Sequence, residues 1–215
     1  MIQINNATIL YDKVPLFAPF HLHLKEKEIG CITGPSGMGK TSLLRAIMGF
    51  VPLHTGTIFI RQQEMTPATI QHLRQQIAWI PQEINPPVEW VKELIEELLF
   101  LRNNTKRLSL DSYQIKKKVI PLFEQLDLPI SLFEQRVSEL SGGQRQRILL
   151  IIATLLQKPL IIMDEPTSAL DEHSTALVMN YIQQLCSAGS TFLCVSHSAQ
   201  FKTICHQEFP LQPTL

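Results

Sequence analysis

A glycine-rich segment that directly follows an apolar run is the feature that most constrains the fold of this chain. Ile29–Thr33 is apolar, the next eight residues have the pattern G-x-x-x-x-G-K-T, and residues 41–48 have the composition of a helix that stops at Gly49. A strand, a glycine-rich turn and a helix in this order are typical of the phosphate-binding loop of α/β nucleotide-binding proteins. The eight residues are Gly34, Pro35, Ser36, Gly37, Met38, Gly39, Lys40 and Thr41.

The residue types in this segment indicate what it would hold. Glycines let backbone amides approach a phosphate without an intervening Cβ, and the start of the helix adds further amides. Lys40 would reach the β- and γ-phosphates of a nucleotide, and the Thr41 hydroxyl would hold Mg²⁺. The alternative is an ordinary glycine–proline turn, but the flanking strand and helix favour the phosphate loop.

The periodicity of apolar residues predicts the remaining architecture. Alternation predicts half-buried strands around Ile2 and Ile4 and over Phe20–Leu24, and apolar runs predict strands at 57–60, 78–80, 160–163 and 191–195. Residues 84–156 follow helical spacing, with Asp111 as a candidate helix cap, and 174–186 forms another helix. Apolar strands separated by helices imply a parallel sheet covered on both faces.

We therefore expect an α/β fold. It consists of a P-loop NTPase core with a mainly parallel sheet, an N-terminal antiparallel β part and a helical insert. Residues 1–215 form a single domain, with 1–83 and 157–215 as the nucleotide-binding core and 84–156 as the helical subdomain.

Composition limits the cellular compartment and the kinds of binding partner that we expect. The formal net charge is +0, from 19 basic and 19 acidic residues, and such a balance does not suggest nucleic-acid binding. The 4 cysteines include no Cys-x-x-Cys pair, which fits a reducing cytoplasm. The N-terminus lacks a signal-peptide pattern, and the greasiest run, 148–156, is far shorter than the roughly 20 residues of a membrane helix. Any membrane component would have to come from another chain.

Three further motifs follow the glycine-rich loop. Asp164 and Glu165 come directly after an apolar run, where a metal ligand and a general base must be different carboxylates. Ser141, Gly142, Gly143 and Gln144 have the form of a helix capping box with two glycines in the first turn, which suits a second phosphate site. His197 ends the last apolar run, where a neutral imidazole can bond a γ-phosphate.

Together with an isolated Gln82, these motifs resemble, in identity and order, the nucleotide-binding subunit of ATP-binding cassette (ABC) transporters, over nearly the whole chain. The resemblance implies ATP and Mg²⁺ as cofactors. It implies that Asp164, Thr41 and Gln82 hold the metal and that Glu165, His197, Gln82 and Lys40 are catalytic. It assigns nucleotide contacts to Tyr11, by stacking on adenine, and to residues 34–41, Ser42, Ser141, Gly142, Gly143, Gln144 and Asp171.

The resemblance also implies an assembly. In the family, two cassettes form a head-to-tail dimer in which the signature motif of each, here residues 140–147 with Gly142 and Gly143, closes the nucleotide site of the other subunit. The segment ending at Asp171 resembles the loop that crosses the dimer interface. A separate transmembrane permease would dock near Trp90, and the chain would lie on the cytoplasmic face of the membrane. The alternative for both Trp90 and Tyr11 is a structural role as a core residue. His21 and His23 alternate on one strand and could suggest a metal site, but a solvated strand face is favoured.

Two other classes of function remain open at this point. A cassette ATPase without a membrane partner, for example of the iron–sulfur assembly type, would share every motif. A P-loop kinase of a small molecule would leave the motif at Ser141 without a role. The transported substrate and its direction are not encoded in these motifs, and Ser198 stands where the family often has an aspartate.

Overall fold

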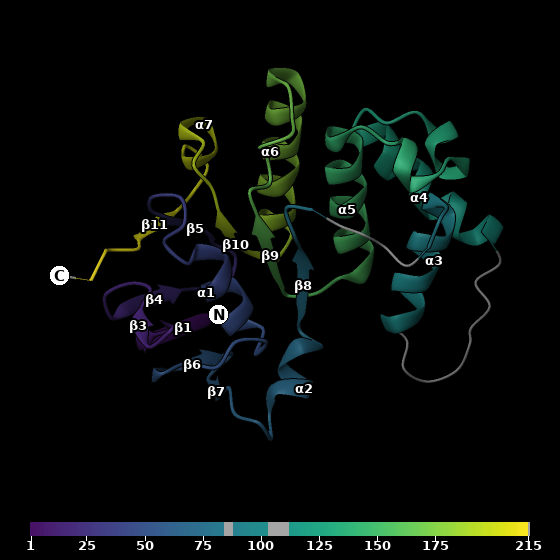
Figure 1. Ribbon diagram of the computed structural model, residues 1–215. Coiled ribbons are helices and arrows are strands. Elements are labelled where there is room, and N and C mark those ends of the chain that lie inside the picture. The colour runs from purple at the N-terminus through teal and green to yellow at the C-terminus, as the bar shows by residue number, and fades with distance from the viewer. Residues whose placement is uncertain (84–87, 103–111, 215) are drawn as a thin grey trace.

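In the part of the chain that the structure describes, a five-stranded sheet, a four-stranded sheet and a two-stranded hairpin are present, with helices on both sides of the five-stranded sheet (Figure 1). The structure is a computed structural model that describes residues 1–83, 88–102 and 112–214, with backbone only for 100–102, 112 and 113. No helix in these ranges is both long and apolar enough to cross a membrane.

The smaller sheet is antiparallel and comes from the N-terminal part of the chain. Its strands are β1 (Ile2–Thr8), β4 (Phe20–Leu24), β6 (Thr55–Ile60) and β7 (Gln63–Glu64), in the order β4-β1-β6-β7. In β4 the apolar side chains are buried and His21 and His23 are exposed, as alternation predicts. Both histidines thus lie on the exposed face of β4, as the solvated-face interpretation expects.

The larger sheet is parallel and carries the candidate site. Its strands are β5 (Ile29–Thr33), β8 (Ile77–Ile80), β9 (Leu160–Asp164), β10 (Thr191–Val195) and β11 (Gln207–Pro210), in the order β11-β5-β10-β9-β8. Both neighbours of β10 are in register with it, since Val195 pairs with Ile32 and with Asp164. Parallel pairing places the carboxyl ends of β5, β8, β9 and β10 along one edge.

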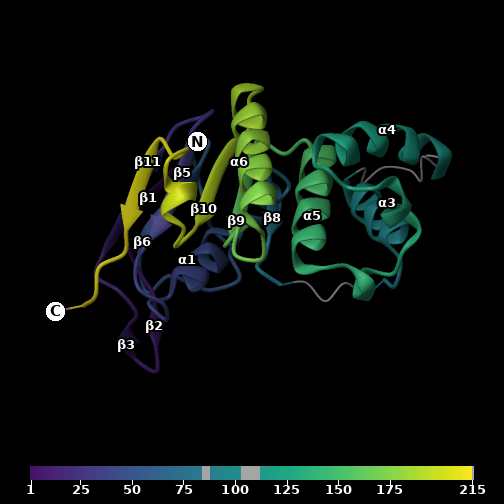
Figure 2. The same cartoon turned by 90° about the horizontal axis from the view of Figure 1, so that it is seen from above.

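Two apolar cores lie on opposite faces of this sheet. One core joins the sheet to helices α3 (Val91–Arg102), α4 (Ser112–Gln125), α5 (Gly142–Leu156) and α6 (Glu172–Ser187). The other packs α1 (Lys40–Ile47), the antiparallel sheet and Leu73 of α2 (Ile70–Arg74) against the opposite face. Figure 2 shows α1 and α6 on opposite sides of β9 and β10.

Connecting elements complete the fold. The 3₁₀ helices Ile130–Glu134 and Val137–Glu139 lead from α4 to α5, and the short helix α7 (Ala199–Lys202) leads from β10 to β11. The candidate cap Asp111 lies outside the described residues.

Two short β elements differ from the sequence expectation. A two-stranded hairpin, β2 (Leu10–Tyr11) and β3 (Val14–Pro15), extends from the antiparallel sheet, although no strand was expected there. The strand β11, which was not expected either, contains Pro210 and is an edge strand paired with β5. Proline is tolerated there because it ends an edge strand and has no backbone N–H to leave unpaired.

Candidate functional site

The glycine-rich loop turns from the end of β5 into α1 through three glycines with positive φ. Gly37 has φ 78° and Gly39, the residue before α1, has φ 86°. A Cβ on Gly39 would lie 2.9 Å from Cδ1 of Leu16, whereas a Cβ on Gly37 would have no atom within 4 Å. Gly39 therefore requires glycine for both conformation and space, and Gly37 for conformation alone.

Lys40 is folded into the loop rather than extended into solvent. Its ammonium group donates to the carbonyl oxygens of Gly34 and Pro35, both at 2.8 Å, and the residue is only 7% exposed. Burial lowers the pKa of Lys40, and the nearby carboxylates of Glu165 and Asp164 oppose that shift. The loop thus holds a buried cation beside two carboxylates.

Asp164 and Thr41 meet at the carboxyl end of β9. The Thr41 hydroxyl donates to Oδ2 of Asp164 at 2.8 Å, and Asp164 is 4% exposed. These residues are 123 positions apart in the sequence and are brought together because α1 packs against β9. A buried carboxylate beside a hydroxyl offers the oxygen ligands that Mg²⁺ prefers, so the residues fit the metal that the sequence predicts.

Glu165 and His197 face each other from the ends of neighbouring strands. Nε2 of His197 lies 3.6 Å from Oε1 of Glu165, and the backbone N–H of His197 donates to Oε2 of Glu165 at 3.3 Å. The Glu165 side chain is 15% exposed, and that of His197 is 47% exposed. Glu165 has φ 51°, a left-handed conformation that is costly for a residue with a Cβ.

Gln82 lies at the same edge of the parallel sheet, after β8, which pairs with β9 on the side opposite to β10. It is exposed and follows β8, whose Ile80 is in register with Met163 of β9. The structure therefore brings the phosphate loop, Gln82, Asp164, Glu165 and His197 to one edge of the parallel sheet, where ligands gather in open α/β folds.

Ser141 and Gln144 form the predicted capping box at the start of α5. The amide of Gln144 donates to the Ser141 hydroxyl at 3.1 Å, and the amide of Ser141 donates to the Gln144 side chain at 2.9 Å. Ser141 and Gly142 are exposed, so the first turn of this helix is accessible from outside the chain. Within the monomer this is a second, separate helix terminus with glycine amides.

Sequence reasoning missed how the signature glycines pack inside the chain. A Cβ on Gly142 would lie 3.1 Å from Cβ of Ala169, and one on Gly143 would lie 3.1 Å from Cδ2 of Leu170. The segment that follows Glu165 therefore rests on the start of α5. No signal in the sequence could have revealed this contact, because it joins the segment after Glu165 to the first turn of α5 through the tertiary fold.

Asp171 is the N-cap of α6. Its carboxylate accepts from the amide of Ser174 at 2.8 Å and from the Ser174 hydroxyl at 3.0 Å. The backbone hydrogen bond from Ser174, followed by its side-chain hydrogen bond, lowers the pKa of Asp171. In the monomer Asp171 thus has a structural partner, and its assigned nucleotide contact stays a prediction.

Tyr11 lies outside both apolar cores. It is 69% exposed on the β2–β3 hairpin, so its ring faces solvent and a core role is excluded. Stacking on a base remains its predicted role.

Trp90 is half-buried at the start of α3. The guanidinium of Arg136 lies 5.3 Å from the ring centroid and the ammonium of Lys92 lies 5.8 Å from it. It belongs to neither core, and its ring is partly accessible between two cations. Pro86 and Pro87, on its N-terminal side, lie outside the described residues.

Ser198, the departure from the family pattern, has a structural role. Its hydroxyl accepts from the amide of Phe201 at 3.1 Å and caps α7. Serine and aspartate are both favoured at this position, so the exchange preserves the local structure after His197.

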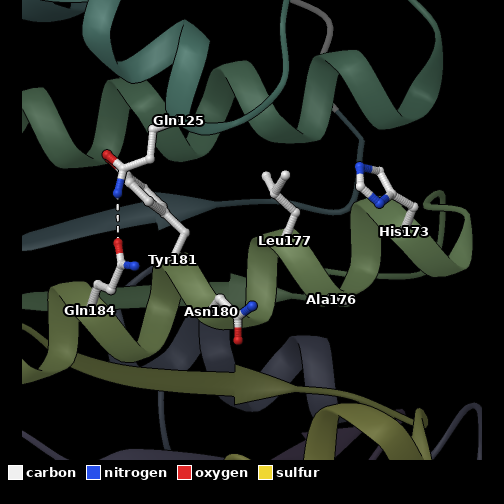
Figure 3. Close-up of a pocket in the computed structure, with 7 residues that line it drawn as sticks. All are labelled: Gln125, His173, Ala176, Leu177, Asn180, Tyr181 and Gln184. Atoms are coloured by element: carbon white, nitrogen blue, oxygen red, sulfur yellow. Dashed lines mark hydrogen bonds between the residues drawn. The ribbon is translucent and has the colours of Figure 1, made fainter.

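A separate hollow of about 400 Å³ lies along α6, facing the end of α4 (Figure 3). The amide of Gln125 donates to that of Gln184 across it at 2.6 Å. It contains none of the predicted site residues.

Comparison with known proteins decides the family. The family model described as "ABC transporter" matches residues 17–168. The chain belongs to the ABC transporter family. The resemblance read from the sequence is therefore confirmed.

Among curated relatives, the chain is 33% identical over 213 residues to the methionine import ATP-binding protein MetN of Carboxydothermus hydrogenoformans, covering 94% of this chain and 60% of that protein. It is 27% identical to the zinc transport system ATP-binding protein TroB of Treponema pallidum, covering 93% of this chain and 73% of the relative. It spans 27% of the ATP-dependent permease MDL1 of Candida albicans, at 31% identity over 85% of this chain. The chain thus spans less than two thirds of the length of MetN and of MDL1.

Solved structures confirm the fold of this ABC cassette. A dimeric ATP-binding cassette in a post-hydrolysis state, bound to ADP and Pi, superposes with a TM-score of 0.87 at 23% identity, covering 99% of this chain and 94% of that one. The protein cbiO1 of Clostridium perfringens, part of an ABC transporter complex, gives a TM-score of 0.80 at 21% identity, covering 98% and 84% of the two chains. At these sequence identities the similarity shows the fold alone.

Proposed function

We propose that this chain is the ATP-binding and ATP-hydrolysing subunit of an ABC transporter, which drives transport through a separate membrane permease. The observation that carries the proposal is the convergence of Lys40, the Thr41–Asp164 pair and the Glu165–His197 pair on one edge of the sheet. The names of the relatives support transport over a cassette without a membrane partner.

The chemistry follows from the positions of these groups. The loop amides and Lys40 would bind the β- and γ-phosphates, for which Lys40 would exchange its bonds to the Gly34 and Pro35 carbonyls. Glu165 would accept a proton from the attacking water, and His197, in contact with Glu165, would orient it and bond the γ-phosphate. Tyr11 would stack on the adenine.

Magnesium would be held by Thr41 and Asp164, with Gln82 at the same edge. Bound Mg²⁺ neutralises charge that develops on the β- and γ-oxygens. Thr41 pairs with Asp164, whereas Glu165 pairs with His197. Glu165 would therefore not be a metal ligand and could act as the base.

The signature motif supports a dimer. Ser141 and Gly142, at the start of α5, are exposed, so the backbone amides there can be reached from outside the chain. The chain already has its own phosphate loop, so this second site is free to serve the nucleotide of another chain. We propose that it closes the nucleotide site of a second copy, with Ser141, Gly142, Gly143 and Gln144 contacting the γ-phosphate and Asp171 at the interface. Residues 1–83 and 157–215 would form the nucleotide-binding core and 84–156 the helical subdomain. Trp90, which is partly accessible, is the proposed permease contact, and the complex would lie on the cytoplasmic face of the membrane.

The test is the variant Glu165→Gln, which keeps the size of the side chain and removes its basicity. We expect it to bind ATP, to form a stable dimer with ATP and Mg²⁺, and to lose at least about 100-fold in turnover, the usual contribution of a general base. Size-exclusion chromatography with ATP and a phosphate-release assay measure the two effects.

The matched control is Glu64→Gln on β7, an exposed carboxylate remote from the sheet edge. It should leave both dimer formation and turnover unchanged. Full turnover in Glu165→Gln would remove Glu165 from its role. A strict monomer in Glu165→Gln with ATP and Mg²⁺ would refute the shared-site proposal.

A further inference from the structure

The phosphate loop is held from outside at both of its ends. Its first residue, Gly34, lies against Leu211 in the segment after β11, since a Cβ on Gly34 would lie 3.3 Å from both the Cβ and the carbonyl oxygen of Leu211. Its last glycine, Gly39, lies against Leu16, whose Cβ would be 3.2 Å and whose Cδ1 would be 2.9 Å from a Cβ on Gly39. Two side chains from distant parts of the sequence thus contact the two glycines that bound the turn.

Leu211 is fixed in place by its backbone and by the apolar core. Its N–H donates to the carbonyl oxygen of Thr33, the residue before the loop, at 2.8 Å, which continues the pairing of Pro210 with Thr33. Leu211 is 4% exposed and belongs to the same apolar core as α1. The start of the loop is therefore attached to the segment after β11 as well as to β5.

Leu16 belongs to a short segment that is anchored next to it. Phe17, the following residue, is fully buried. The N–H of Ala18 donates to the carbonyl oxygen of Gln212 at 2.9 Å. Because Gln212 directly follows Leu211, this hydrogen bond joins the two segments that contact the ends of the loop.

A loop of this composition gains order from such contacts. Glycine allows a wide range of backbone conformations, so fixing Gly34, Gly37 and Gly39 costs conformational entropy. A side chain packed against each end restricts that range before a ligand arrives. Lys40 also restrains the loop by its hydrogen bond to the Gly34 carbonyl, but that bond would be exchanged when phosphate binds. The contacts of the two leucines would remain.

We infer that Leu16 and Leu211 are positioning residues for nucleotide binding, which hold both ends of the phosphate loop in the conformation that receives the phosphates. The part of this inference that concerns the nucleotide rests on the proposed function. The ordering of the loop by the two side chains does not.

The first measurement needs no nucleotide. Amide hydrogen exchange over residues 34–41 is compared between the unsubstituted protein, Leu211→Ala and Leu16→Ala, at a temperature at which all three are folded. Each substitution leaves a space beside one end of the loop, so local opening becomes easier. We expect exchange of these amides to be about tenfold faster in both variants.

The second measurement is equilibrium binding of ATP with Mg²⁺. If about one tenth of the molecules hold the loop in the competent conformation, the apparent Kd rises about tenfold. The KM for ATP should rise by a similar factor, whereas kcat at saturating ATP should stay within about twofold, because bound phosphates restore the loop.

Leu73→Ala and Leu53→Ala are the matched controls. Leu73, on α2, is fully buried, and Leu53 is half-buried as Leu16 is. Both pack in the same apolar core as Leu211, and neither is among the atoms nearest to a Cβ on the two end glycines. The controls should lower the free energy of unfolding without changing the exchange of residues 34–41 or the Kd for ATP.

Equal changes in the controls, unchanged exchange in both test variants, or a fall in kcat with no rise in KM would overturn the inference. If Leu211→Ala does not fold, Leu16→Ala, which removes a half-buried side chain, decides alone. If the unsubstituted protein binds no ATP, the proposed function fails, but the exchange rates still decide whether the two side chains order the loop.

Discussion

Replacing Thr41 by valine tests whether the hydrogen bond between the phosphate loop and β9 stabilises the fold without any ligand. Valine has nearly the shape of threonine but cannot donate, so Asp164, which is 4% exposed, would lose its hydroxyl partner. Hydrogen bonds to charged groups contribute about 1.5–3 kcal/mol. The attraction between Asp164 and the nearby Lys40 remains in the variant, so we expect a loss of about 2 kcal/mol, near the lower end of that range.

The assays are equilibrium urea unfolding, which gives the free energy, and thermal unfolding, both on nucleotide-free protein in the presence of a chelator. For a chain of 150–250 residues each kcal/mol corresponds to about 2–4 °C, so the midpoint of thermal unfolding should fall by about 4–8 °C. Thr41→Ser keeps the hydroxyl and is the matched control, with an expected loss below about 1 kcal/mol.

A double-mutant cycle isolates the pair. In an Asp164→Ala background, Thr41→Val should cost less than about 0.5 kcal/mol, because the acceptor is already absent. If Thr41→Val costs no more than Thr41→Ser, or the same in both backgrounds, the hydrogen bond does not contribute as argued.

Two further substitutions test the fold. Gly39→Ala should cost more than Gly37→Ala in urea unfolding without nucleotide. Both force a Cβ into positive φ, at about 1–2 kcal/mol, but only Gly39 also meets Leu16 at 2.9 Å, and equal losses would show that this contact relaxes freely. Phe123→Ala, in the fully buried core of the helical region, should cost about 3–5 kcal/mol, whereas Ile120→Ala, at a position 36% exposed on the same helix, should cost far less. Similar losses for these two variants would contradict the assigned packing.

The sequence predicted the strands and helices whose periodicity is strong. Ile29–Thr33 and Leu160–Asp164 are buried throughout, and such apolar runs are read without knowledge of the fold. The hairpin containing Tyr11 and the strand β11 were not predicted, because their strands are short and mostly polar or exposed. Their existence depends on neighbours that lie far away in the sequence.

The candidate site was predicted as a set of residues but not as a geometry. Nothing local to Thr41 indicates that its hydroxyl meets Asp164, and nothing local to Glu165 indicates its left-handed φ. Both follow from the order of the parallel strands. From the sequence, Ser198 is only a difference from the aspartate that the family often has. The structure shows that it caps α7.

The order of strands in the parallel sheet also has a consequence for synthesis on the ribosome. The antiparallel sheet uses only residues up to Glu64, so it can assemble early. β5, by contrast, has β10 and β11 as its two neighbours, and both are made more than 150 residues later. Pairing over such separations is slow, and a nascent chain that has not yet extended past Thr191 cannot bring Lys40 and Glu165 together. The emerging polypeptide is therefore expected to lack the assembled candidate site until its last parallel strands are in place.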